Sequence, residues 1–286
     1  MSQNIVYING QFMPKEKAQV SVMDRGFLYG DGVYEVIPVY NGKLFLFEDH
    51  IKRLNYSLEQ IRLDVDWSKQ QWQQMMENLI EKNGAGNLGL YLQVTRGAAE
   101  KRLHTFPEKV TPTVFAMVWT LSEPAQVEDI PPCKVITTED IRWKRCDIKS
   151  ISLLGNVLMS QLAREANVDE AFVVNDGIVT EGASSNFFVV KDGRVMTSPG
   201  DNRILGGITR KMVIDLLARQ GLEVEEKELL LQEVMDADEI WLTSSTKEIR
   251  PVIEVDGLAV GDGQPGTLWK QTASLFLEDK KALFYG

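Results

Sequence analysis

Two residues of this sequence have side chains suited to covalent chemistry on a cofactor, Lys149 and Glu181. Lys149 lies between Ile148 and the largely apolar stretch 151–154. Because an apolar environment disfavours an ammonium ion, a lysine at this place can become a nucleophilic amine. Three nearby basic side chains add like charge with the same expected effect: Arg142, Lys144 and Arg145.

Glu181 follows a predicted strand and precedes the small-residue run 182–186, Gly-Ala-Ser-Ser-Asn. A carboxylate in such a loop can accept a charge-assisted hydrogen bond from a cationic ring nitrogen. Together with a nucleophilic lysine, it predicts pyridoxal phosphate bound as a Schiff base to Lys149, with Glu181 keeping the pyridine nitrogen protonated. Ser184 and Ser185 either add hydrogen bonds to phosphate or substrate, or only complete the turn. The pair indicates an enzyme that processes amino acids.

A phosphate site is indicated independently. In the segment 203–210, Gly206 and Gly207 come directly before a predicted helix that we expect Thr209 to cap. Backbone N–H groups at a helix start favour a bound anion. The hydroxyl-rich run 243–246, Thr-Ser-Ser-Thr, and the early arginine Arg53 are further candidate ligands.

Arg102 and His104 lie two residues apart in the polar loop 97–107. Alternate residues of an extended segment point to the same side, so the pair can grip a carboxylate. This predicts a binding site for an α-carboxylate substrate.

Composition excludes several other classes. The 286 residues carry 31 basic and 41 acidic side chains, a net charge of -10, which disfavours a nucleic-acid partner. The two cysteines, Cys133 and Cys146, allow no disulfide framework and have no zinc-ligand spacing. No signal peptide or membrane-spanning segment is visible, so we expect a cytoplasmic protein.

The elements expected to position these residues mix strands and helices. Asn-Gly turns after 5–8 and after 32–40 predict hairpins with 11–13 and 43–47. Further strands are expected at 88–95, 113–120, 134–138, 171–174, from 178, 186–190, 194–197 and 239–243. Helices are expected at 50–61, after the N-cap Ser68, at 155–166, from 209 and from 267. We therefore predict an α/β (α+β) protein with domains 1–122 and 133–286, joined by the proline-rich linker 123–132.

Ordered motifs along nearly the whole chain resemble the fold type IV pyridoxal-phosphate enzymes, and within them the D-amino-acid aminotransferases. The matching motifs are 24–26, 30–35, 50–54, 94–97, 102–104, 140–143, 147–150, 180–182, 207–210 and 243–246. The resemblance implies a small N-terminal α/β domain and a larger C-terminal barrel-like domain, with the cofactor between them.

The resemblance also assigns roles. Lys149 resembles the Schiff-base lysine and proton shuttle, Glu181 the partner of the pyridine nitrogen, and Leu205 the residue packed on the ring. The matching phosphate ligands are Arg53, Ile208, Thr209, Ser245 and Thr246. Tyr34, Arg102 and His104 match the carboxylate trap of the D-specific subgroup. Because Arg and His reach in from the neighbouring subunit there, a homodimer is implied.

The function implied is ping-pong transamination between a D-amino acid, such as D-alanine, and 2-oxoglutarate or pyruvate. Aminodeoxychorismate lyase and branched-chain-amino-acid aminotransferase share the lysine and the glutamate and stay open as alternatives. So does a binding protein that has lost turnover.

Overall fold

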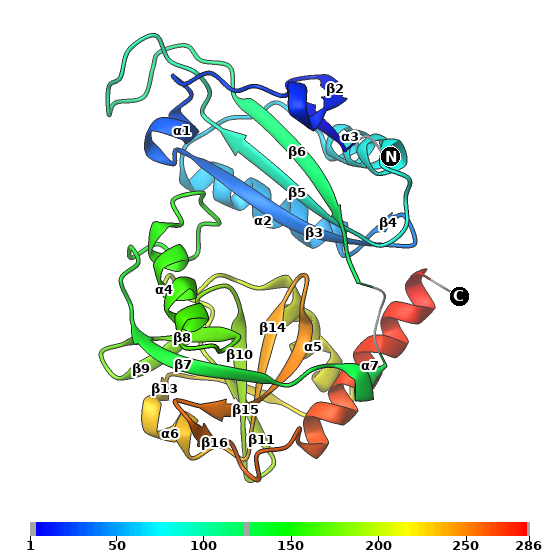
Figure 1. Ribbon diagram of the computed structural model, residues 1–286, viewed down its shortest axis with the longest axis vertical. Coiled ribbons are helices and arrows are strands. Elements are labelled where there is room, and N and C mark those ends of the chain that lie inside the picture. Colours follow the sequence, from blue (N-terminus) through cyan, green and yellow to red (C-terminus); the bar gives the residue numbers. More distant parts are fainter. Residues whose placement is uncertain (1–3, 123–125, 285–286) are drawn as a thin grey trace. The chain divides into compact units, whose positions relative to one another are not determined.

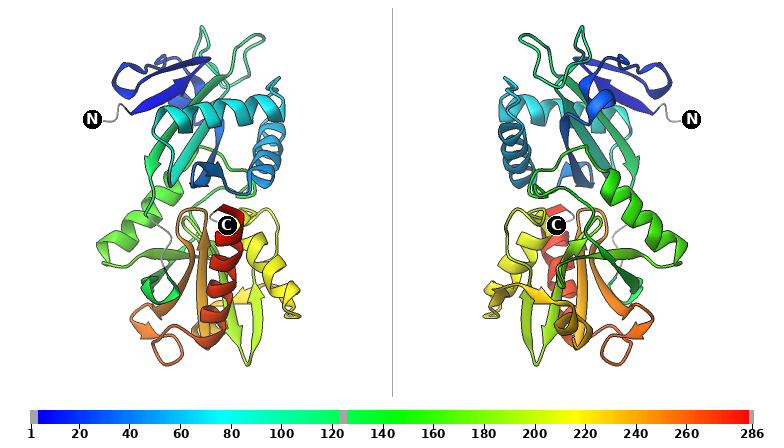
Figure 2. Two further views of the ribbon diagram at one scale, coloured as in Figure 1. Left: turned by 90° about the vertical axis from the view of Figure 1, so that its right-hand side faces the viewer. Right: turned by 90° about the vertical axis from the view of Figure 1, so that its left-hand side faces the viewer.

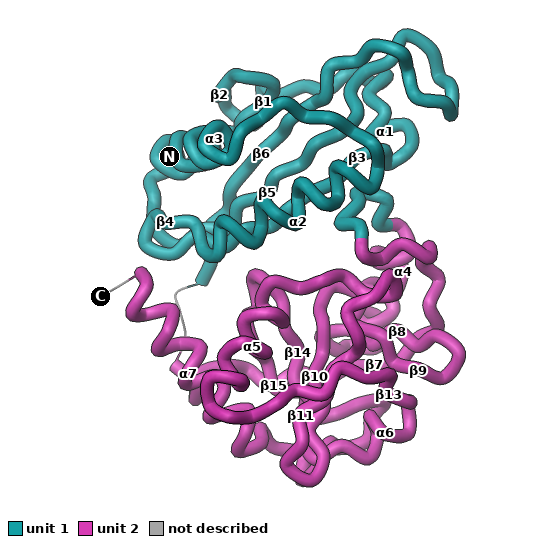
Figure 3. The backbone as a smooth tube through the Cα atoms, turned by 180° about the vertical axis from the view of Figure 1, so that it is seen from behind, with its two compact units in different colours: residues 1–123, 148–153 teal, residues 124–147, 154–286 magenta. Residues whose placement is uncertain are grey.

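The computed structural model describes residues 4–122 and 126–284, which form two compact units. Unit 1 comprises residues 1–123 and 148–153, and unit 2 comprises 124–147 and 154–286 (Figure 3). The short stretch 148–153, which carries Lys149, therefore packs with unit 1 although both of its neighbours along the chain belong to unit 2. Of the predicted linker, residues 123–125 lie outside the described residues.

Unit 1 is built on a six-stranded antiparallel sheet with strand order β2-β1-β6-β5-β3-β4 (Figure 1). Helix α2 packs against β3, and α3 packs against β1 and β6. Its elements are β1 (Ile5–Ile8), β2 (Gln11–Pro14), η1 (Lys15–Lys17), α1 (Arg25–Tyr29), β3 (Gly32–Tyr40), β4 (Lys43–Leu44), α2 (Phe47–Gln60), α3 (Lys69–Lys82), β5 (Leu88–Thr95) and β6 (Thr113–Thr120).

The apolar spacing in the sequence explains the helices of unit 1. Helix α3 buries Trp72, Met75, Met76 and Leu79, because these recur on one face at helical spacing. Ser68 caps this helix in a capping box with Gln71, as predicted. The predicted strand 43–47 is too long: β4 ends at Leu44, and Phe47 already begins α2.

Unit 2 is built on a ten-stranded sheet, β12-β11-β10-β14-β15-β7-β8-β9-β13, with β16 beside β15. Its elements are η2 (Val127–Asp129), β7 (Cys133–Glu139), α4 (Leu154–Glu165), β8 (Glu170–Asn175), β9 (Ile178–Gly182), β10 (Asn186–Lys191), β11 (Arg194–Thr197), α5 (Ile208–Arg219), β12 (Val224–Glu226), β13 (Leu229–Leu230), α6 (Leu231–Met235), β14 (Glu239–Ser244), β15 (Glu248–Val255), β16 (Leu258–Ala259) and α7 (Thr267–Phe284).

The larger sheet curls on itself. Strands β9 and β10 are separated by β14, β15, β7 and β8 in the hydrogen-bonded order, yet the side chains of Glu181 on β9 and Asn186 on β10 are hydrogen-bonded at 3.1 Å. A flat sheet would hold these strands far apart, since neighbouring strands are spaced by about 4.8 Å. The unit is therefore barrel-like, as the resemblance implied. Helices α5 and α7 pack side by side, and both contact β14 (Figure 2).

Candidate functional site

Lys149 is held within unit 1 by its backbone. Its N–H donates to Ser57 Oγ at 3.1 Å, and its carbonyl accepts from the N–H of Tyr34 at 2.9 Å. The next residue, Ser150, forms a β-bridge with Val33. The Nζ atom lies 4.2 Å from the centroid of the Tyr34 ring. The Lys149 amine is thus placed beside strand β3 and over an aromatic face.

The apolar environment expected around Lys149 is only partly present. Ile148 is buried, whereas Leu154, the last residue of the apolar stretch, is 71% exposed. Two of the three basic residues expected to add like charge are also paired within unit 2, Arg142 with Asp140 and Arg145 with Asp147. Arg142 and Arg145 are therefore not unpaired cations that would disfavour the ammonium form of Lys149.

Arg53, predicted to bind phosphate, is fixed by a buried carboxylate of the same unit. Its Nε and one terminal nitrogen donate to the two oxygens of Glu35, both at 2.8 Å. His50 Nδ1 also contacts Glu35, at 2.8 Å. Burial alone would raise the pKa of Glu35, but the charge of Arg53 and the hydrogen bonds of Arg53 and His50 lower it to about 2. Burial lowers the pKa of His50, so the imidazole is held neutral.

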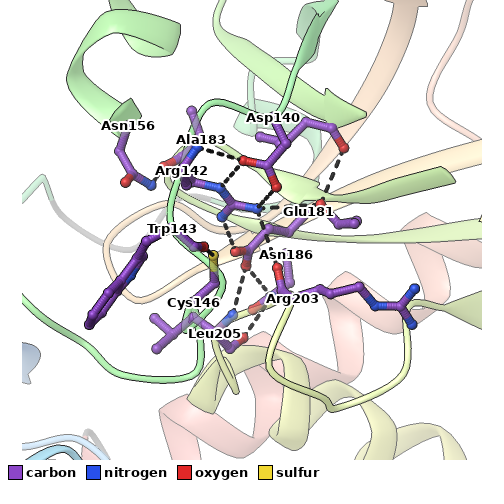
Figure 4. Close-up of polar contacts among 12 residues, drawn as sticks. Asp140, Arg142, Trp143, Cys146, Asn156, Glu181, Ala183, Asn186, Arg203 and Leu205 are labelled. Atoms are coloured by element: carbon purple, nitrogen blue, oxygen red, sulfur yellow. Dashed lines mark hydrogen bonds and ion pairs between the residues drawn. The ribbon is translucent and has the colours of Figure 1, made fainter. Parts of the chain in front are cut away.

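Glu181 lies buried on β9 in unit 2, with both carboxylate oxygens supplied with donors (Figure 4). One oxygen pairs with Arg142. The other accepts from the Asn186 amide at 3.1 Å and from the N–H of Leu205 at 3.0 Å. This carboxylate is fixed in position beside the Arg142 guanidinium, which suits a partner for a pyridinium nitrogen.

Arg142 connects Glu181 to a second carboxylate. Its guanidinium donates twice to Asp140, both at 3.0 Å, and to the carbonyl of Arg203 at 3.3 Å. Burial would lower the pKa of Arg142, but the hydrogen bond to Asp140 and the charge of Glu181 raise it. Arg142 therefore stays charged and holds Glu181 in one orientation.

Leu205 lies directly beside Glu181. Besides the N–H contact, its carbonyl accepts from the Asn186 amide at 2.9 Å. These two backbone bonds fix the residue that was predicted to pack on the ring of the cofactor. Ser184 and Ser185, by contrast, donate to Glu170 at 2.6 and 3.1 Å, so the structure favours the interpretation that they complete the turn.

Helix α5 begins with its N-terminus free of side-chain caps. It starts at Ile208, and its N-cap is Gly207, so the prediction that Thr209 caps it is wrong. A side chain at Gly207 is impossible without rearrangement, because a Cβ there would stand 1.9 Å from Asn186 Oδ1. The first N–H groups of a helix have no partner within the helix. Ile208 and Thr209 therefore present a start suited to an anion.

A second element of this phosphate region is the turn between β14 and β15. Ser244 pairs with Glu248 across the two strands, so Ser245, Thr246 and Lys247 form the connection. On β14, the Thr243 hydroxyl is buried and has no hydrogen-bond partner in the structure. Thr243 is paired with Asn186 on β10, so the two side chains lie on the same face of the sheet.

These features fit the predicted cofactor. A buried hydroxyl without a partner normally needs one, and here it lies opposite Asn186, which contacts both Glu181 and Leu205. An uncapped helix start, a fixed carboxylate and a primary amine provide the chemical groups that a phosphorylated pyridine aldehyde requires. Lys149, Tyr34 and Arg53 belong to unit 1, and Glu181, Leu205, Ile208, Thr209, Ser245 and Thr246 belong to unit 2.

The predicted carboxylate trap divides into two places within unit 1. Arg102 and His104 both lie against Tyr29, at 5.3 Å from its ring centroid and 5.5 Å between rings. Tyr34 instead stacks on Tyr91 at 5.6 Å. The pair Arg102 and His104 is thus on one side of its loop, as predicted, while no described contact joins it to Tyr34.

Arg25, which the sequence analysis did not select, fixes the loop of Arg102 and His104. Its guanidinium donates to the carbonyls of Leu103 at 2.6 Å and of His104 and Thr105 at 3.3 Å. It also pairs with Asp31 at 2.7 Å. Three consecutive carbonyls on one guanidinium hold the backbone in a single conformation, so the exposed side chains project from a rigid base.

Besides Arg25, the sequence analysis missed roles for Glu35, His50, Asp140 and Asn186. Glu35, His50 and Asp140 lie inside motifs that carried the resemblance, and this was the available signal. Their roles depend on partners distant in sequence, which spacing does not reveal.

Comparison with known proteins identifies the family. The family model described as Amino-transferase class IV matches residues 32–255. The D-alanine aminotransferase of Bacillus licheniformis is 43% identical over 270 residues, covering 94% of this chain and 95% of that protein. That of Listeria monocytogenes serotype 1/2a (strain 10403S) is 38% identical over 282 residues, covering 96% and 95%.

Solved structures agree with the fold. A branched-chain amino acid aminotransferase of Escherichia coli has a TM-score of 0.90 and 26% identity, covering 99% of this chain and 95% of that chain. Another, from T.th. and solved with pyridoxamine 5'-phosphate, has a TM-score of 0.90 and 24% identity, covering 99% and 95%. The predicted fold type is confirmed, and the chain belongs to the class IV aminotransferases.

Proposed function

We propose that this protein transfers the amino group of a D-amino acid such as D-alanine to a 2-oxo acid, 2-oxoglutarate or pyruvate, with pyridoxal phosphate as cofactor. The observation that carries the proposal is the match over at least 93% of the chain to proteins named D-alanine aminotransferase. The donor set described above supports the cofactor. The reaction runs as a ping-pong exchange in which the amino acid reacts first and the oxo acid second.

Pyridoxal phosphate supplies an aldehyde that bonds to amines and a ring that withdraws electrons from the substrate α-carbon. Lys149 would hold the cofactor through its Nζ and would move a proton between the substrate α-carbon and C4′. Glu181, oriented by Arg142, keeps the ring nitrogen protonated. Leu205 would pack on the ring, and the residues that would hold the phosphate are Arg53, Ile208, Thr209, Ser245 and Thr246.

Tyr34, Arg102 and His104 form the proposed site for the substrate carboxylate. Because Arg102 and His104 have no described contact with Tyr34, we propose that they serve the site of a second copy in a homodimer. Helix α4 supports a homodimer. It exposes an apolar stripe of Leu154 (71%), Val157 (58%), Leu158 (49%) and Leu162 (45%), while Met159 and Ala163 are buried on its other face. Such a stripe is typical of a protein interface.

The deciding experiment is a half-reaction followed by cofactor absorbance with D-alanine, L-alanine and L-leucine. D-alanine should convert the aldehyde form to the amine form of the cofactor, and the two L-amino acids should not. Conversion by L-leucine but not by D-alanine would instead identify a branched-chain aminotransferase. Release of pyruvate and p-aminobenzoate from aminodeoxychorismate would identify the lyase.

The role of Lys149 is tested by Lys149→Ala. Turnover should be nearly abolished, because no other residue is assigned to the proton transfer, and the cofactor should be retained without a covalent bond. Absorbance follows turnover and retention of the cofactor. Borohydride reduction followed by peptide mapping tests whether the cofactor is covalently bound. Lys144→Ala, which removes an exposed lysine, is the control. Unchanged turnover in Lys149→Ala would assign the nucleophile elsewhere.

The trap is tested by Arg102→Ala, with Lys101→Ala as a control that removes a neighbouring charge. Loss of a charge-assisted pair to the carboxylate should raise KM by about tenfold or more for every α-carboxylate substrate, while Lys101→Ala leaves it near the original value. Steady-state kinetics with two D-amino acids measure this. An increase for only one of them would mean that Arg102 contacts the side chain and not the carboxylate.

We further propose a cytoplasmic location. The described part of the chain has no helix long and apolar enough to cross a membrane. Both cysteines are free thiols, which is typical of a reducing compartment. We propose the domains 1–122 and 133–286, joined by the linker 123–132. Residues 148–153 belong by sequence to the second domain but pack in compact unit 1.

A further inference from the structure

Helix α7 buries a lysine that none of the roles above uses. Lys280 is 0% exposed, and its Nζ lies 2.6 Å from Oε1 of Glu248. Its helix otherwise buries apolar side chains such as Phe276 and Leu277. A buried ammonium carries a desolvation cost that an apolar residue would avoid. The charge at this place therefore needs a reason beyond packing.

Glu248 gives a reason for the buried charge of Lys280, because Glu248 closes the turn proposed to hold the cofactor phosphate. It begins β15 opposite Ser244, so only Ser245, Thr246 and Lys247 separate the two. Its backbone is left-handed, with a φ of 56°, a conformation that is costly for a residue other than glycine. Contact with Lys280 fixes the side chain of this residue and helps to hold its backbone in place.

The charge of Glu248 also matters. Thr246 is two residues away along the chain, and a carboxylate so close repels a phosphate dianion. Two like charges that share a partly screened site repel each other enough to change an affinity by about tenfold or more. A cation on the carboxylate cancels most of that repulsion. Lys280 provides this cation from α7, which packs beside β14 (Figure 2).

We propose that Lys280 is a positioning residue for the cofactor phosphate: it neutralises Glu248 and fixes the turn 245–247 so that the turn can accept a dianion. The proposal rests on the proposed phosphate role of this turn. It extends the cofactor site to the C-terminal helix, far along the sequence from the other ligands.

The test is the dissociation constant of pyridoxamine 5'-phosphate, which cannot bond covalently to Lys149, measured by fluorescence titration of the full-length apoprotein at 25 °C. Lys280→Met should weaken binding about tenfold, because the Glu248 carboxylate then loses the cation of Lys280. Glu248→Gln should not weaken it, because the amide oxygen of Gln can still accept a hydrogen bond from Lys280 and the repelling charge is gone. The double variant should return to within about threefold of the original protein. Lys281→Met, which removes the exposed neighbouring charge, is the control.

Unphosphorylated pyridoxamine separates the proposed role from a merely structural one. It lacks the dianion, so Lys280→Met should leave its affinity unchanged. Equal weakening of both ligands, or equal weakening by Lys280→Met and Glu248→Gln, would overturn the proposal. If Lys280→Met does not fold, Glu248→Gln and the double variant decide, since weaker phosphate binding in either one contradicts it. Failure of the original protein to bind the phosphorylated ligand would contradict the proposed function itself.

Discussion

Glu35 in unit 1 and Glu181 in unit 2 are both buried glutamates that pair with an arginine, Arg53 and Arg142 respectively. The surroundings of the two pairs differ. Glu35 is 0% exposed, and its described partners are Arg53 and His50. Glu181 shares Arg142 with another carboxylate, Asp140, and takes its remaining donors from an amide and a backbone N–H.

The difference indicates opposite assignments. In unit 1 the arginine is the proposed ligand, and the glutamate holds it. In unit 2 the glutamate is the proposed ligand, and the arginine holds it. The same type of ion pair is thus proposed to present a cation in unit 1 and an anion in unit 2.

The largest effect is expected from Glu181→Gln compared with Glu35→Gln. An amide at 181 cannot stabilise a protonated ring nitrogen by charge, so kcat should fall by about 10²–10³-fold, the range typical for loss of one electrostatic contact in a transition state. Glu35→Gln should change kcat less and cofactor affinity more. Steady-state kinetics and cofactor titration measure both. Equal losses of kcat in the two variants would contradict the proposal that Glu181 contacts the cofactor while Glu35 only orients Arg53.

A smaller effect concerns stability against pH. Because the pKa of Glu35 is lowered to about 2, its pairing stabilises the native state fully above the ordinary value of 4.5, and this contribution is lost as the pH falls from 4.5 towards 2. The contribution is about 3 kcal/mol. The difference in unfolding free energy between the original protein and Glu35→Gln should therefore shrink across this window. Urea unfolding at several pH values measures it, and a difference independent of pH would mean that the pKa of Glu35 is the same in the native and unfolded states.

The smallest effect should come from replacing each arginine by lysine, which keeps the charge but loses the planar fork. Arg142→Lys should lower kcat about tenfold with cofactor affinity nearly unchanged, because it only misorients Glu181. Arg53→Lys should weaken cofactor affinity by a similar factor and leave kcat of the loaded enzyme nearly unchanged. The opposite result for either variant would reverse its assigned role.

Local pattern predicted much of the fold. The strands 88–95 and 113–120 have the predicted bounds, and Ser68 caps α3, because alternation and capping depend on adjacent residues. The five-residue helix α1 and the strand β15 were not predicted. Helix α1 is too short to show a period, and Pro251 within β15 argues against a strand there.

The residues of the candidate site can be selected from the sequence to a similar extent. Lys149, Glu181 and Arg53 stand in motifs that sequence alone can recognise. The partners Glu35, Arg142 and Arg25 act through contacts that span from 18 to about 80 residues along the chain. Such contacts follow from strand order and not from spacing. The start of α5 also depends on a contact that spacing does not reveal. Its N-cap is Gly207 and not the expected Thr209, because Asn186 leaves no room for a side chain at position 207.

The return of residues 148–153 to unit 1 has a consequence for dissecting the protein. The segment pairs with Val33 and Tyr34 on β3, so a fragment ending at 122 would lack those partners and expose that part of the strand to solvent. A fragment starting at 133 would carry Lys149 without the strand that anchors it. Because the chain crosses between the units three times, the halves are not interchangeable modules. Recombination with a relative would need to exchange 148–153 together with the N-terminal part.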